Sequence, residues 1–311
     1  MTHPLVLCNP RAGGGKAARR WPALEADLQA ILGPIDSLLP GSPEETATAA
    51  GRAARAGQPL VLVGGDGTLN AAMAGIGPVL DAGLPCPPIA LVSLGSGGDF
   101  CRALGLMPRD LASARALAAG QFRRIDLGRI DLSGADGQPV TRWFLTVANA
   151  GLSARVVQAM QASHLPALIG PKLAYVPFVL RELFRSPGSR LVLRPDSGPQ
   201  TETRALIVSV ANTAYFAAGM GIAPPADPRD GQFDIVTIRQ DRSVRPWHLR
   251  HLYTGRILSH PAVTHQCAVA VTLSAADASP LPLDADGELM GFLPARLTCL
   301  PGALAIALPP A

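Results

Sequence analysis

The 311-residue chain lacks a long hydrophobic run, and its five cysteines form no CxxC pair and no metal-ligand spacing. No stretch approaches the roughly 18 apolar residues of a membrane-spanning helix, which argues against an integral membrane protein. The first residues, MTHPLVLCNP, have no basic region before their short apolar run and so predict no secretion signal. The cysteines therefore indicate reduced, mostly buried thiols in a cytoplasmic protein.

Lysine is nearly absent, because Lys16 and Lys172 are the only two and the other basic residues are arginines. We attribute this bias to genomic base composition. The formal net charge of +4 favours anionic partners such as nucleotides, anionic lipid surfaces or nucleic acid. Hydrophobic residues make up 48% of the chain, which is enough for a large core.

Short apolar strands alternate with helices over the first 120 residues. We expect strands at 5–8, 60–63 and 89–94, and helices at 16–32, 42–56, 69–74, up to 104 and at 111–119. Ser42 is the expected N-cap of the second helix, with Pro43 at its first position and Glu45 at its third. The alternation predicts an open, mostly parallel sheet covered by helices, an α/β domain of residues 1–124.

The pattern changes after Phe122 to short β-rich segments separated by turns. They predict a second, mainly antiparallel β domain over residues 125–294, interrupted by one helical insertion at about 152–185. The terminal segment PGALAIALPP is expected to return as a strand to either domain, so residues 295–311 are a candidate for completing the first one.

Glycine-rich turns follow three of the expected strands: NPRAGGGKAARRW, GGDGT and SLGSGGDFCRALG. The carboxyl ends of parallel strands meet at one edge of a sheet, so the three turns should converge on one crevice. Free backbone N–H groups at helix starts bind phosphate, and glycines let the ligand approach. For the first turn, a P-loop fails at Pro10 and Ala17, whereas a weak dinucleotide fingerprint and an ordinary turn remain open.

The GGDGT turn carries an acid where phosphates are expected. Gly64, Gly65 and Gly67 leave room for a bulky anion, and Thr68 is expected to cap the following helix. Asp66 would repel phosphate unless a cation intervenes or the carboxylate acts as a base. Both options indicate Mg-nucleotide chemistry.

The segments NPRAGG, GGDGTLN and LGSGGDFCRALG, followed by GIAPPADPRDGQFDIV and DADGE, resemble the diacylglycerol kinase catalytic-domain family over nearly the whole chain. The family includes bacterial soluble lipid kinases and the sphingosine and ceramide kinases. The resemblance implies an N-terminal nucleotide-binding domain and a C-terminal β-sandwich with the active site between them. It implies transfer of the γ-phosphoryl group from ATP, with Mg²⁺, to a lipid hydroxyl such as that of diacylglycerol.

The resemblance also assigns roles to single residues. Glu288 is the implied proton acceptor, and Asp66 is its expected counterpart across the cleft. Asp230 is the implied ligand of a structural Mg²⁺, helped by backbone carbonyls at Asp227 and Gln232. The implied ATP-binding residues are Asn9, Pro10, Arg11, Ala12, Gly13, Gly64, Gly65, Gly67, Thr68, Leu69, Asn70 and Ser96.

Some positions depart from the family pattern. Gly98 replaces an asparagine, Ala71 a glutamate and Ser96 a threonine, and Leu39 and Pro40 stand where a threonine is expected. Two alternatives therefore stay open: a NAD kinase-like phosphotransferase, which shares GGDG, and an attenuated nucleotide- or lipid-binding protein.

A lipid substrate requires transient contact with the inner membrane surface. The segment 239–256, RQDRSVRPWHLRHLYTGR, offers arginines, Trp247 and Tyr253 for this, with a solvated helix face as the alternative. The apolar segment 174–184 is expected to belong to the core, with a lipid-tail cleft as the alternative. We expect no nucleic-acid partner, and the sequence indicates no oligomeric state.

Overall fold

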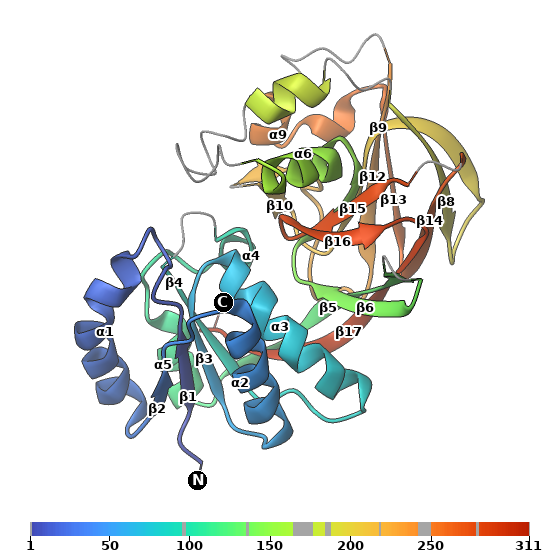
Figure 1. Ribbon diagram of the computed structural model, residues 1–311. Coiled ribbons are helices and arrows are strands. Elements are labelled where there is room, and N and C mark those ends of the chain that lie inside the picture. Colours follow the sequence, from blue (N-terminus) through green and yellow to red (C-terminus); the bar gives the residue numbers. More distant parts are fainter. Residues whose placement is uncertain are drawn as a thin grey trace.

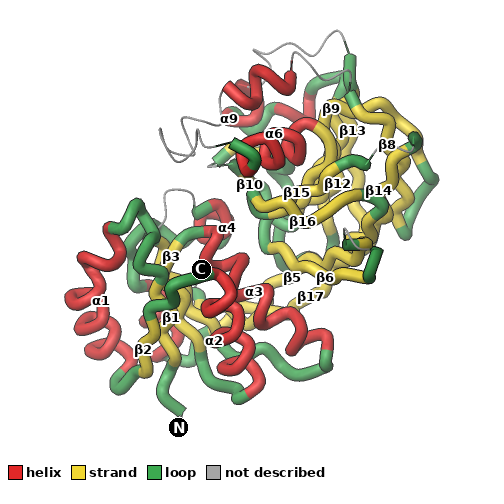
Figure 2. Tube along the Cα trace, viewed as in Figure 1, coloured by secondary structure: helices red, strands yellow, loops and turns green. Residues whose placement is uncertain are grey.

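The structure, a computed structural model, describes residues 2–94, 98–134, 137–163, 177–183, 188–217, 219–241, 250–277 and 280–310. An α/β part and a β-rich part lie side by side in Figure 1, and Figure 2 shows the helices concentrated in the first of them. Among the described residues, no helix has the length and apolar character needed to cross a membrane.

The α/β part contains the first nine elements of the chain. They are β1 (Leu5–Cys8), α1 (Lys16–Leu32), β2 (Asp36–Leu38), α2 (Pro43–Arg55), β3 (Leu60–Gly64), α3 (Asp66–Asp81), β4 (Ile89–Ser93), α4 (Asp99–Ala103) and α5 (Ala112–Ala118). The four strands are parallel in the order β4-β3-β1-β2.

Both faces of this parallel sheet are covered, which explains the unbroken apolar runs of its central strands. Residues of α2 and α3 pack against one face, and residues of α1 and α5 pack against the other. The layers are visible in Figure 1, where the strands lie between the two helix pairs. The expected open α/β sheet is confirmed.

Two local expectations for this part have different outcomes. Ser42 is the N-cap of α2, and its side chain accepts a hydrogen bond from the Glu45 N–H, as predicted. The helix after GGDGT, expected at 69–74, instead spans Asp66–Asp81 and begins at the acid itself. An acid in the first turn of a helix interacts favourably with the helix dipole, so Asp66 extends the helix rather than the loop.

The β-rich part contains the remaining elements. They are β5 (Phe122–Ser133), β6 (Pro139–Phe144), β7 (Val147–Gly151), α6 (Leu152–Gln161), β8 (Ser189–Pro195), β9 (Thr201–Ala211), β10 (Tyr215–Phe216), β11 (Met220–Gly221), β12 (Phe233–Arg239), α9 (Arg250–Tyr253), the 3₁₀ helix η2 (Ile257–Ser259), β13 (Val263–Ala268), β14 (Ala270–Ala275), β15 (Pro282–Ala285), β16 (Glu288–Phe292) and β17 (Ala295–Ala307).

Pairing within the β-rich part is antiparallel, and a large core cluster lies between its layers. A second cluster packs α6 and α9 against β9 and β12. Of the expected helical insertion, α6 and residues 177–183 are helical, and the stretch between them lies outside the described residues. The β-rich segment that contains DADGE forms β15 and the start of β16, which pair as a hairpin.

The last strand, β17, connects the two parts. It pairs antiparallel with β5 along most of its length and with β14 at its start, and near its end Ile306 pairs parallel with Ile89 of β4. The Ser113 hydroxyl donates to the Ala307 carbonyl (2.6 Å) and accepts from the Leu91 N–H (2.9 Å). The terminal segment therefore returns to both parts rather than to one.

Candidate active site

The three glycine-rich turns converge at the carboxyl edge of the parallel sheet. Cys8 lies beside Val63, and Gly64 lies beside Ser93, so β1, β3 and β4 end at the same level. The Asn9 N–H continues the pairing by donating to the Val63 carbonyl at 3.0 Å. The expected convergence of the three turns at one edge of the sheet is therefore present.

Asn9 and Thr68 join the first turn to the second. The Asn9 side-chain amide donates to the Thr68 hydroxyl at 2.9 Å, and its carbonyl oxygen accepts from the Arg11 N–H. We expected Thr68 to cap α3, but this prediction is wrong, because the N-cap of α3 is Gly65. Gly64 is needed for this packing, because a Cβ there would lie 2.2 Å from the Thr68 hydroxyl oxygen.

Gly13 joins the first turn to the third. Its φ of +61° lies in the left-handed region, and a Cβ would approach the Leu94 carbonyl oxygen to 2.8 Å. A side chain here would separate the two turns. The glycines thus allow the turns to pack against each other, in addition to leaving space for a ligand.

Asp66 joins the second turn to the third. One carboxylate oxygen accepts a hydrogen bond from the Gly98 N–H at 2.8 Å, while the other is buried with no hydrogen-bond partner among the described residues. Gly98 has a φ of +75°, a conformation that the asparagine of the family pattern also tolerates. The free carboxylate oxygen is a hard donor of the kind that Mg²⁺ prefers.

The DADGE segment of the β-rich part forms a tight turn that faces the start of α3. Asp286 (φ 51°) and Gly287 (φ 80°) occupy the two central positions of the β15–β16 hairpin, as in a type I′ turn. The Asp286 carboxylate accepts from the Leu145 N–H, the Thr146 N–H and the Thr146 hydroxyl at 2.6–2.8 Å. Asp286 was not among the predicted site residues, although an Asp-Gly pair between two strands is typical of a hairpin turn.

Glu288 is the first residue after this turn, and it meets the start of α3. Its carboxylate lies near the Asn70 side chain, which influences its pKa, and a Cβ on Gly67 would lie 3.7 Å from its Oε1 atom. Glu288 is exposed as a whole residue, yet partial desolvation by the surrounding protein raises the pKa of its carboxyl group. The negative charge of Asp286 raises this pKa further, and the interaction with the Asn70 side chain lowers it.

Asp66 and Asp286 are close enough to interact. Burial is the main cause of the raised pKa of Asp286, its hydrogen bonds oppose the shift, and the charge of Asp66 adds to it. Asp66, Asp286 and Glu288 therefore bring negative charge from both parts of the protein to one place. Such a gathering fits a cation-dependent phosphate site.

A row of buried polar side chains lies behind the hairpin. Asp284 accepts a hydrogen bond from the Asn149 amide at 3.2 Å, and Asn149 accepts one from the Ser209 hydroxyl at 2.7 Å. These residues face one another across β15, β7 and β9. Burial raises the pKa of Asp284 to about 7, opposed by its bonds with Asn149 and Ser153.

The turn 227–232 holds the residues predicted to bind a structural metal. The Asp227 carboxylate forms a two-pronged ion pair with Arg229 at 2.7 Å, so its side chain is already engaged. One Asp230 carboxylate oxygen accepts from the Gln232 N–H at 3.0 Å. The charges of both acids also raise the pKa of Asp126, after the larger effect of burial.

Asp126 was missed in the sequence analysis. It is 1% exposed on β5, and its carboxylate accepts from the Gly231 N–H (2.8 Å) and the Gly302 N–H (2.7 Å). It thereby fixes the turn 227–232 against β17. Asp126 lies between two apolar residues in a strand that also carries arginines and Asp131, so the sequence offers little signal that its carboxylate is buried.

The remaining predicted ATP-binding residues differ in what they can offer. Leu69 and Ala12 have side chains in the hydrophobic core, which leaves only their backbone for a ligand. Pro10 and Arg11 lie on the first turn, with Arg11 exposed. Ser96 lies outside the described residues.

The fold and the site define a class of protein: an α/β domain of the nucleotide-binding type joined to a β-sandwich. Residues 3–130 match the diacylglycerol kinase catalytic domain, and residues 146–308 match the YegS C-terminal NAD kinase β-sandwich-like domain. The chain belongs to the diacylglycerol kinase catalytic-domain family, and it is an enzyme of the kinase class.

Individual relatives agree with this assignment. A diacylglycerol kinase of Mycobacterium tuberculosis is 27% identical over 98% of this chain and 94% of its own. A structure of a candidate diacylglycerol kinase from Bacillus anthracis shares the fold with a TM-score of 0.80 at 20% identity, covering 99% of this chain and 95% of that one. Yeast NADH kinase is more distant in fold, with a TM-score of 0.54 at 13% identity over 99% and 84%.

Proposed function

We propose that the protein transfers the γ-phosphoryl group of ATP to the hydroxyl group of a lipid of the diacylglycerol type. The observation that carries this proposal is the meeting of Glu288 with the first turn of α3, beside Gly67 and Asn70. Phosphoryl transfer to an alcohol requires a proton acceptor near the substrate hydroxyl and a binding site for the phosphates, such as the start of a helix.

The converging turns support ATP binding. The N-terminus of α3 follows β3 directly, and the first amides of a helix lack helical partners and attract phosphate. Asn9 and Gly13 hold the first turn against the second and third. In this proposal the predicted set from Asn9 to Ser96 surrounds the nucleotide, with Leu69 and Ala12 contributing backbone only.

Mg²⁺ fits the donors at the crevice, because the free oxygen of Asp66 is a hard anionic ligand. When bound, the ion would neutralise charge on the phosphates. Asp66 would hold it from α3 while its other oxygen keeps the third turn in place. A second, structural Mg²⁺ would use Asp230 with main-chain carbonyls at 227 and 232, since Arg229 occupies the Asp227 side chain.

Glu288 is proposed as the group that accepts the hydroxyl proton. Its raised pKa makes the carboxylate a stronger base than an unperturbed glutamate, and it lies beside Gly67 at the helix start. Asp286 is a positioning residue in this scheme, because its hydrogen bonds with Leu145 and Thr146 fix the turn that carries Glu288.

Contact with the lipid is proposed to occur at the inner membrane surface of a cytoplasmic enzyme. Residues 242–249 of the basic segment 239–256, which include Trp247, lie outside the described residues. In its described part, Arg250 and Arg256 are exposed, and Tyr253 is 68% exposed. Basic and aromatic side chains suit anionic headgroups, so vesicle flotation should increase with anionic lipid and decrease with salt.

The test is incubation with γ-labelled ATP and three acceptors: diacylglycerol in mixed micelles, a total lipid extract, and NAD. Label in the organic phase, absent when Mg²⁺ is chelated, is the expected result, and mass spectrometry of that phase identifies the lipid. Label on NAD would favour the NAD kinase-like alternative. Binding of ATP without transfer to any acceptor would favour an attenuated binding protein.

A further inference from the structure

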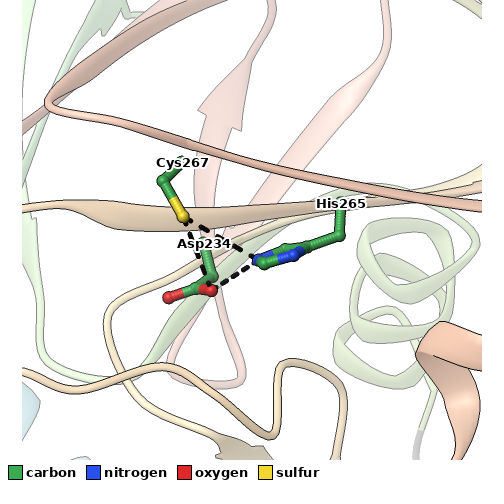
Figure 3. Close-up of side chains that lie close together, drawn as sticks. All are labelled: Asp234, His265 and Cys267. Carbon is green, nitrogen blue, oxygen red and sulfur yellow. Dashed lines mark hydrogen bonds and ion pairs between the residues drawn. The ribbon is translucent and has the colours of Figure 1, made fainter.

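Three side chains with different metal-binding atoms meet on the paired strands β12 and β13. Asp234 of β12 lies directly opposite Cys267 of β13, and His265 comes two residues before Cys267. Residues two apart on a strand point to the same face, so both side chains lie beside Asp234. Figure 3 shows the carboxylate, the imidazole and the thiol turned toward one another.

The donor atoms converge on a single point. The His265 Nε2 atom is 2.5 Å from the Asp234 Oδ1 atom, and the Cys267 Sγ atom is 3.9 Å from each of these two atoms. Tetrahedral Zn²⁺, with bonds of about 2.3 Å to sulfur and about 2.0–2.1 Å to nitrogen and oxygen, separates its donors by roughly 3.3–3.6 Å. The sulfur contacts are within a few tenths of an ångström of this spacing, whereas His265 and Asp234, which form a hydrogen bond here, would have to separate by about 0.8 Å to bind one ion.

The same geometry argues against a nucleophilic Cys-His-Asp arrangement. In such a triad the histidine uses one ring nitrogen for the thiol and the other for the carboxylate. Here a single nitrogen, Nε2, faces both partners. The three residues surround a point between them, which is the arrangement of a ligand set rather than of a proton relay.

Charge and exposure also fit a metal ion. A thiolate, a carboxylate and a neutral imidazole carry two negative charges, which match a divalent cation. Burial raises the pKa of Cys267, and the charges of Asp234 and Asp230 raise it further, so a cation here would relieve crowded negative charge. Asp234 is 4% exposed, whereas the other two side chains open to solvent and leave a position for water.

We propose that Asp234, His265 and Cys267 bind a transition-metal ion of the Zn²⁺ class. Sulfur with nitrogen and oxygen selects such an ion over Mg²⁺, which prefers oxygen alone. The site is distinct from the oxygen-donor turn 227–232 and from the cleft. It joins β13, which pairs only with β12 among the described strands, to the rest of the sheet.

Cobalt titration of the metal-free full-length protein, kept reduced, tests this site independently of kinase activity. Co²⁺ bound through a thiolate gives a charge-transfer absorption, and tetrahedral Co²⁺ gives intense d–d bands. We expect both at one equivalent, displaced by one equivalent of Zn²⁺ and unaffected by excess Mg²⁺. The thiolate signal can be assigned, because Cys267 is exposed and the other four cysteines are buried.

Variants identify the ligands. Cys267→Ser should abolish the thiolate band, and His265→Gln should weaken Zn²⁺ binding by ~100-fold or more, since even an outer-shell change costs about 10–100-fold. Both positions are exposed, so folding should persist, and thermal melts of the metal-free variants check this. His3→Gln, which replaces an exposed histidine far away in sequence, is the matched control, and Asp230→Ala tests separation from the turn 227–232.

The proposal predicts a Zn²⁺-dependent rise in melting temperature for wild type, His3→Gln and Asp230→Ala, and none for Cys267→Ser or His265→Gln. Absence of a thiolate–cobalt band in the wild type would overturn it. Equal Zn²⁺ affinity in wild type and His265→Gln would overturn it as well.

Discussion

At the scale of single residues, the role of Glu288 rests on where its carboxylate lies. We expect Glu288→Gln to reduce turnover by ~10²-fold or more if it removes a typical general base. The amide keeps the shape of the side chain beside Gly67, so affinity for ATP should stay near that of wild type. Steady-state kinetics with a separate ATP-binding measurement checks this.

Glu202→Gln is the matched control for that change, because Glu202 is an exposed β9 carboxylate paired with Arg190 on the surface. Its turnover should equal that of wild type. A Glu288→Gln enzyme with undiminished turnover would remove Glu288 from the mechanism.

Asp66 should respond differently, since its carboxylate has two tasks. Asp66→Asn retains an oxygen for the Gly98 N–H but loses the charge that would hold Mg²⁺. We expect lower activity together with a higher Mg²⁺ concentration for half-maximal rate, measured by titrating Mg²⁺ at fixed ATP. Asp27→Asn, on the exposed face of α1, serves as control. A loss of activity with unchanged Mg²⁺ dependence would assign Asp66 only the role of fixing the turn.

Asp284 should make stability depend on pH. Its pKa is about 7 in the folded protein and near 3.8 when unfolded, so between these values only the folded state holds the proton. Stability should therefore fall as pH rises from about 4 to about 7, by at most about 1.4 kcal/mol per pH unit from this group. Denaturant unfolding of wild type and Asp284→Asn at pH 5 and pH 8 measures the effect.

Other buried acids contribute in the same direction, so the difference between the two proteins is the informative quantity. Asp284→Asn should gain stability relative to wild type between pH 5 and pH 8. An equal difference at both pH values would mean that Asp284 is ionised throughout.

At the scale of elements, the contact between α2 and α3 depends on glycine. A Cβ on Gly75 would lie 1.9 Å from the Ala47 carbonyl oxygen, and one on Gly51 would lie 2.8 Å from the Gly75 carbonyl oxygen. The helices can approach this closely only without side chains at the crossing. Because α3 carries the GGDGT segment at its start, this contact helps position the site.

Gly75→Ala should therefore destabilise the protein. In an open helix the change would stabilise by up to about 1 kcal/mol, but overpacking here should cost about 1–3 kcal/mol or more. Urea unfolding gives the sign. Gly41→Ala, where the nearest atom to a new Cβ is 3.5 Å away, is the control with little expected change. A Gly75→Ala protein as stable as wild type would show that the helices can move apart freely.

At the scale of the whole molecule, β17 makes the two parts interdependent. Leu304, Ile306 and Leu308 belong to the core cluster of the α/β part, although they come last in the chain. We propose that the division at residues 124 and 125 separates two domains only if residues 295–311 are counted with the first.

A fragment of residues 1–133 should aggregate when expressed alone, because β4 and β5 lose their shared partner and apolar surface is exposed. Joining residues 295–311 to it through a flexible linker should restore a soluble fragment with a cooperative thermal transition. Solubility, circular dichroism and a thermal melt of both fragments check this. A fragment 1–133 that folds without the added strand would show that β17 is dispensable there.

The sequence alone determined what depends on local order along the chain. Unbroken apolar runs, each followed by glycines and a helix, were sufficient for the parallel sheet and its converging turns. The family followed from the resemblance of the GGDGTLN, LGSGGDFCRALG and DADGE motifs. Ser42 as N-cap was predictable because capping involves residues only three positions apart. The GGDGT helix was predicted too short, because Asp66 was read as a loop residue while it also suits a helix start.

Only the tertiary structure decided which distant residues meet, because strand pairing brings together positions that sequence spacing keeps apart. Such pairing brings Glu288 to the start of α3 and lets Asp126 accept hydrogen bonds from Gly231 and Gly302. It also places β17 beside strands of both parts. Cys267 lacked any metal-ligand spacing in the sequence. It gained Asp234 as a neighbour only because β12 and β13 run antiparallel in this register, and register is fixed by which faces of the strands are buried.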